Sequence, residues 1–151
     1  MADLAVRKIY AQNLRAFFTR RITNRESEER IPFGNHPAID YIEHYFVWPE
    51  YDDFKTHRYS LKHLSPTGKE TLKRILLFLY TDLPFEWPPC VGDRPVLFNW
   101  LTFGWAGRRH DRMKPAFDSH GSLDTFPFRN RAELCRELSL PRAGLSLRLK
   151  F

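Results

Sequence analysis

HRYSLKHLSPTGKETLKRILLFL, residues 57–79, carries the strongest structural signals in the chain. Its second half begins with Ser65, a favourable helix N-cap, and Pro66, whose missing N–H costs nothing at the first helical position. Apolar residues then recur at the helical period and predict one buried stripe, formed by Leu72, Ile75, Leu76 and Leu79. Residues 58–64 instead alternate between apolar and polar side chains, which predicts a strand that runs directly into this helix.

The residues before this segment predict, in order, a helix at 4–21, a short helical turn at 23–30, a helix at 36–46 and a strand at 47–50. Asp3 is the expected N-cap of the first helix. Arg20 and Arg21 fall in its expected last turn, where they would complement the helix dipole. Two short strands joined by a turn and followed at once by a capped helix are typical of a wing leading into the last helix of a winged-helix domain.

Three segments resemble the plectin / S-ten family, which includes a eukaryotic small-subunit ribosomal protein. The first is RKIY (residues 7–10). The second is the pair of aromatic predicted strands YFVW (45–48) and RYSL (58–61). The third is LSPTG (64–68), which leads a helix that closes at Leu83-Pro84. The resemblance spans about residues 5–90. It implies a winged-helix fold, no catalytic site, and contacts with rRNA and neighbouring ribosomal proteins.

We therefore expect an α+β protein in two parts. Residues 1–90 are predicted to form a winged-helix-like domain, with helices and a short β-hairpin. Residues 91–151 are predicted to form a Pro/aromatic segment and a basic C-terminal extension, which contains one more helix, RAELCREL, capped by Asn130.

Charge points to an RNA partner. The chain has a formal net charge of +6, with 17 Arg and 7 Lys. Arg offers a planar fork that pairs with phosphate and stacks on bases. Residues 106–151 carry 10 basic against 5 acidic residues, whereas residues 1–105 are nearly neutral. The candidate RNA-binding residues are Arg108, Arg109, Arg112 and Lys114, and then Lys69, Lys73 and Arg74, although both groups could equally be solvated surface.

A protein-interaction module is the alternative, for instance a viral accessory protein that binds and inhibits one host protein. The apolar run at 96–105 is either core or a docking strip, and Trp100, Phe103 and Trp105 are its candidate contacts. A DNA-binding winged-helix regulator ranks last, because residues 36–46 contain no Lys or Arg for a recognition helix.

Catalytic and metal motifs are not apparent. His57 and His63 are too far apart along a predicted strand to be obvious co-ligands, and Cys90 and Cys135 stand alone. There is no phosphate-binding glycine loop and no GxSxG elbow. No apolar run approaches the length of a membrane span. We expect a non-enzymatic cytoplasmic protein without cofactor, metal or membrane association.

Overall fold

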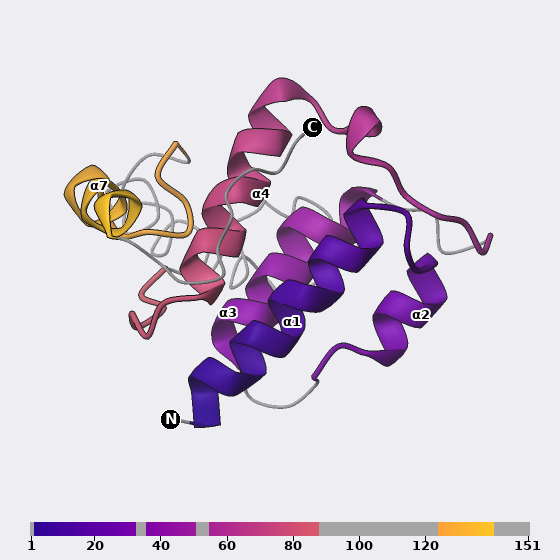
Figure 1. Cartoon of the computed structure of the whole chain (residues 1–151), viewed down its shortest axis with the longest axis horizontal. Coiled ribbons are helices and arrows are strands. Elements are labelled where there is room, and N and C mark those ends of the chain that lie inside the picture. Colours follow the sequence, from indigo (N-terminus) through magenta and orange to yellow (C-terminus); the bar gives the residue numbers. More distant parts are fainter. Residues whose placement is uncertain (1, 33–35, 51–54, 88–123, 141–151) are drawn as a thin grey trace, which may run out of the picture.

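The computed structural model describes residues 2–32, 36–50, 55–87 and 124–140, and this part of the chain is mostly helical (Figure 1). Its elements are α1 (Ala2–Phe18), α2 (Asn24–Glu29), α3 (Pro37–Ile42), the π-helix η1 (Glu43–Val47), the 3₁₀ turns η2 (Trp48–Glu50) and η3 (Leu61–His63), α4 (Pro66–Leu79) and α7 (Arg131–Ser139). Helix α1 packs against α4 and α2, and α4 also contacts α7.

One aromatic-rich core joins α1, α3 and α4. Tyr10, Leu14, Phe17 and Phe18 of α1 are buried. They meet a second set from α3 and α4, namely Ile39, Ile42, Leu72, Ile75, Leu76 and Leu79. The Phe17 and Phe18 rings lie 5.1 Å apart, edge to face, a geometry that aromatic pairs prefer. The buried faces of these amphipathic helices thus supply most of the apolar burial that holds the fold together.

The prediction for α4 is confirmed. Ser65 caps the helix by accepting a hydrogen bond from the amide of Gly68 at 3.0 Å, and Pro66 occupies the first turn. The whole predicted stripe is buried. Helix α7 begins in the same way, since the side chain of Asn130 accepts from the amide of Glu133 at 2.9 Å. Local capping chemistry is enough to place both helix starts.

The predicted α+β, winged-helix-like fold is wrong. Among the described residues there is no strand, only an isolated antiparallel bridge between Thr19 and Ser60. Residues 58–64 are irregular and end in η3, and residues 47–50 are the end of η1 and η2. Two short segments without a third strand or a shared ladder gain little as a sheet. The expected wing of the plectin / S-ten resemblance is therefore not formed.

The helix predicted at 36–46 exists, but it changes period. Pro37 begins α3, and from Glu43 the wider π-helical turns continue to Val47. Val47 is buried, while Tyr45 and Trp48 remain 46% and 48% exposed. The π-helix, a form often found at functional sites, thus leaves Tyr45 on the surface, and Trp48 follows it at the start of η2.

Helix α1 ends earlier than predicted. The amide of Arg20 donates to the carbonyl of Phe17 at 3.1 Å, and the amide of Arg21 donates to that of Ala16 at 2.9 Å. Arg20 has φ 63°, a left-handed conformation that usually belongs to glycine. These features form a Schellman cap, so Arg20 and Arg21 lie beyond the last turn. Asp3 lies inside the first turn and is not an N-cap.

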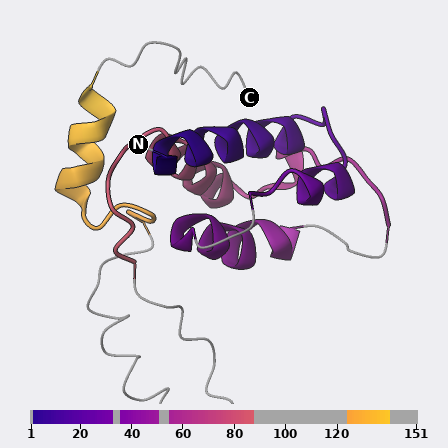
Figure 2. The ribbon, with the colours of Figure 1, turned by 90° about the horizontal axis from the view of Figure 1, so that it is seen from below.

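Residues 124–140 pack onto the helices formed earlier in the chain (Figure 2). Phe126 joins the main core, and Phe128 packs with Leu77 and Phe78 of α4. The Phe78 and Phe128 rings lie 5.6 Å apart, edge to face. No helix in the described ranges is long and apolar enough to cross a membrane.

Candidate functional sites: a basic ridge and an aromatic groove

The residues just after α1 and the segment that runs into η3 lie side by side and form a basic ridge, which we define as Arg20, Arg21, Lys55, Arg58 and Lys62. All five side chains are exposed. The Thr19–Ser60 bridge joins the two segments, and the Arg58 guanidinium donates to the carbonyl of Arg20 at 3.5 Å. Two stretches far apart in sequence thereby present their charges together.

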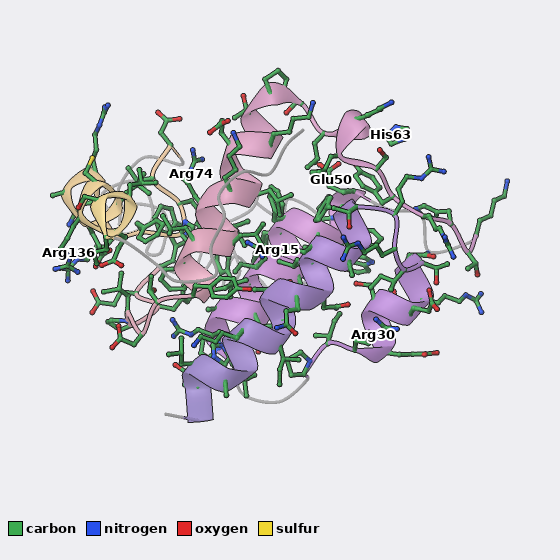
Figure 3. The ribbon with its side chains drawn as sticks, in the orientation of Figure 1. Arg15, Arg30, Glu50, His63, Arg74 and Arg136 are labelled. Carbon is green, nitrogen blue, oxygen red and sulfur yellow. The ribbon has the colours of Figure 1, made fainter. Side chains whose placement is uncertain are left out.

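Asn24 holds the second segment in place. Its side-chain amide donates to the carbonyl of Lys55 at 3.1 Å, and its side-chain oxygen accepts from the amide of His57 at 3.0 Å. The amide of Asn24 also donates to the carbonyl of His57 at 3.0 Å. Asn24 is buried, so these bonds replace hydrogen bonds to water that its polar groups lose on folding. His63 lies at the outer side of η3, near this end of the molecule (Figure 3).

The ridge carries an excess of positive charge. Residues 19–25 and 55–63 contain no Asp or Glu. The acids that flank these segments in sequence are Glu26, which closes the capping box of α2 with Thr23, and Asp53, which lies two residues before Lys55. Hydrogen bonds from the backbone and hydroxyl of Thr23, helped by the charges of Arg30 and Arg58, lower the pKa of Glu26. Glu26 is therefore already engaged, and it does not neutralise five cations.

A second surface lies on α3 and η1 and is an aromatic groove of about 490 Å³. Its lining residues are Pro37, Asp40, Tyr41, His44, Tyr45, Phe85 and Trp87. Tyr41 is central to this wall, with ring centroids 4.6 Å from Tyr45 and 5.5 Å from Phe85. Trp87 packs edge to face on Phe126 at 5.1 Å, which ties the floor of the groove to the core.

Among the described residues that line the groove, Asp40 is the exposed acidic residue and there is no Lys or Arg. Glu43 of η1 is not among the lining residues, and it accepts a hydrogen bond from the hydroxyl of Tyr10 at 2.8 Å. Burial, opposed by this bond and supported by the charge of Glu28, raises the pKa of Glu43 from 4.5 to about 7.

A buried polar network near the N-terminus is structural. Arg7 donates to the carbonyl of Leu83 at 2.6 Å and to Asp3 at 2.9 Å, and its guanidinium lies 5.0 Å from the Phe78 ring. Asp3 also pairs with His36, at the start of α3. These contacts join α1 to α3 and to the chain after α4, as expected for a buried and fully paired arginine.

The predicted RNA-binding residues on α4 are partly buried or paired within the protein. Lys73 pairs with Glu70 at 2.6 Å, and Lys69 is half-buried. Arg74 points to the 124–128 segment, where it donates to the carbonyl of Phe126 at 3.0 Å, and burial lowers its pKa (Figure 3). The other predicted residues lie outside the described ranges, namely Arg108, Arg109, Arg112 and Lys114 for RNA and Trp100, Phe103 and Trp105 for protein.

Sequence reasoning missed both surfaces. Arg20 and Arg21 were assigned to the dipole of a longer helix, and Arg58 to a strand. The absence of acids in residues 19–25 and 55–63 is a usable signal, but only folding brings the two segments together. For the groove, residues 47–50 were interpreted as a strand, and this interpretation did not predict the exposure of Tyr45 and Trp48 in EHYFVW.

Across the part of the chain that the structure describes, no three His, Cys, Asp or Glu side chains gather in a way that could hold a metal ion. The two surfaces therefore offer binding chemistry, with charge on one and aromatic rings on the other. Comparisons with protein-family models, with curated proteins and with solved structures find no match to this chain.

Proposed function

We propose that this protein is a non-enzymatic, RNA-associated protein whose basic ridge binds the phosphates of RNA. The observation that carries the proposal is the pairing of two acid-free segments, residues 19–25 and 55–63, at one end of the molecule. Clustered cations on one face are the electrostatic footprint of a nucleic-acid-binding surface.

The conformation of Arg20 supports a functional role for the ridge. Glycine would occupy the left-handed position of this Schellman cap without strain, whereas an arginine there is disfavoured. Strained residues are often found where a side chain is needed for function. An arginine in this strained conformation supports a role for its side chain in phosphate binding.

Arginine content favours RNA over a simple anion. Three of the five ridge residues are Arg, and the whole chain has 17 Arg against 7 Lys. A guanidinium can bind phosphate with two bonds and also stack on an unpaired base, whereas an ammonium acts as a point charge. Because the winged-helix fold implied by the ribosomal resemblance is not formed, the proposal is limited to RNA association and does not extend to the small ribosomal subunit.

The test is the salt dependence of RNA binding. Fluorescence anisotropy with a labelled single-stranded RNA should give a steep loss of affinity with salt, since each neutralised phosphate releases counterions. The triple variant Arg21→Ala, Arg58→Ala, Lys62→Ala should bind roughly ten- to a hundredfold more weakly and lose about 2 from the slope of log K against log salt.

A matched control removes the same charge elsewhere. Lys8, Arg30 and Arg131 are exposed and lie outside the ridge, so their triple alanine variant should change affinity much less. Equal losses in the two triple variants would show that net charge alone drives binding and would overturn the assignment to the ridge. The variant with alanine at Arg108, Arg109 and Arg112 measures, in the same assay, how much the second predicted cluster contributes.

A further inference from the structure

We propose that the aromatic groove is a docking site for an arginine side chain presented by a partner protein. This surface is distinct from the basic ridge, because no residue lines both. The inference therefore adds a protein partner to the proposed RNA association and does not depend on it.

The chemistry of the lining favours a cation. Tyr41, Tyr45, Phe85 and Trp87 supply π-faces, and a cation within about 6 Å of such a ring is attracted by its quadrupole. Asp40 adds a full negative charge at the same opening. Asp40 makes no ion pair with a Lys or Arg among the described residues, so its carboxylate remains open to a cation from a partner.

A guanidinium fits these elements better than an ammonium. It is planar, so it can lie on an aromatic ring while its edge makes two bonds to one carboxylate. The Tyr45 ring is 46% exposed and belongs to the same lining as Asp40, so both partners are accessible from solvent. A volume of about 490 Å³ is ample for one arginine side chain and part of its backbone.

The same features disfavour RNA at this site. Among the lining residues that the structure describes, a phosphate would meet Asp40 and no balancing Lys or Arg. The neighbouring exposed Trp48, whose ring centroid lies 5.4 Å from that of His44, extends the aromatic surface beyond the groove. Exposed aromatic residues next to a single charged contact are typical of the central residues of protein interfaces. Charge complementarity thus selects a basic protein segment as the occupant.

In the direct test, matched peptides are titrated into the full chain and two-dimensional NMR measures their binding. The probe is a five-residue peptide, acetylated and amidated, with alanines around two arginines. Its control replaces both arginines by citrulline, which keeps the planar shape but removes the charge. We expect millimolar binding of the arginine peptide and a roughly tenfold or greater loss with citrulline, since both the charged hydrogen bonds and the cation–π attraction disappear.

Substitutions identify the site. Asp40→Asn should weaken the arginine peptide about five- to tenfold, and Tyr45→Leu about two- to fivefold, in line with surface cation–π energies. Both residues are exposed, so the variants should keep the wild-type amide spectrum away from the groove. Glu29→Gln, which removes an exposed carboxylate on α2, is the matched control and should bind as the wild type does.

Three outcomes would overturn the proposal. The first is equal binding of the arginine and citrulline peptides. The second is unchanged affinity in Asp40→Asn. The third is a short RNA, in place of the peptide, that shifts the groove resonances of the wild type but not those of Tyr45→Leu, which would make the groove a base-stacking site.

Discussion

The basic ridge and the aromatic groove are built in opposite ways. The ridge is held by backbone hydrogen bonds around Asn24 and by an unusual backbone conformation at Arg20, and its functional side chains extend into solvent. The groove is a continuation of the core, because Tyr41 and Phe85 also pack against buried residues. Side chains on the ridge are therefore free to be selected for binding alone, whereas those of the groove serve binding and stability together.

The largest expected effect is the pH dependence of stability through Glu43, which precedes the groove residues His44 and Tyr45 in η1. Because burial raises the pKa of Glu43 from 4.5 to about 7, the folded state holds a proton that the unfolded state releases. Stability from this group is complete below pH 4.5 and is lost as pH rises to about 7, by about 3 kcal/mol in total. Glu43→Gln has no carboxyl to titrate and should not lose this stability. In urea titrations, its unfolding free energy should therefore exceed that of the wild type by an amount that grows between pH 4.5 and pH 7.

The control for this prediction is Glu29→Gln on the exposed surface of α2, which should track the wild type at every pH. A constant difference between Glu43→Gln and the wild type from pH 4 to pH 8 would show that the proton is not taken up on folding.

Removing a groove ring should cost stability as well as binding. Tyr41 contacts the rings of Tyr45, Phe85 and Phe126, so Tyr41→Ala removes three aromatic contacts from a half-buried site. We expect a loss of about 2 to 3 kcal/mol. Chemical denaturation measures it, and Arg21→Ala on the ridge should stay within about 0.5 kcal/mol of the wild type. A similar small change in both variants would contradict the contrast between the two regions.

The smallest effect separates stability from function on the ridge. Arg20→Gly relieves the left-handed conformation at φ 63° and should stabilise the protein by about 0.5 to 1 kcal/mol, after the greater flexibility of glycine in the unfolded chain is counted. The same variant should bind RNA less tightly, because it removes one ridge cation. Thermal unfolding measures the first effect and fluorescence anisotropy the second. A variant that is more stable and binds RNA as tightly as the wild type would exclude Arg20 from the interface.

The sequence by itself determined the elements whose signals are local. A Ser-Pro cap and an uninterrupted apolar stripe specify α4 at residues 66–79, and Asn130 specifies the start of α7. Within α1 and α3 the buried positions also follow the helical period, as Leu14 and Ile39 illustrate. These predictions succeed because capping and side-chain periodicity act between residues only a few positions apart.

Only the tertiary structure decided the rest. Residues 58–64 place Tyr59 and Leu64 in the core, as the strand prediction required, yet they do so through an irregular segment, because the described part of the chain offers no strand to pair with. The ridge exists because Thr19 meets Ser60, and the groove because residues 85–87 return to α3. A strand and a binding surface both depend on partners distant in sequence, and local patterns do not specify those partners.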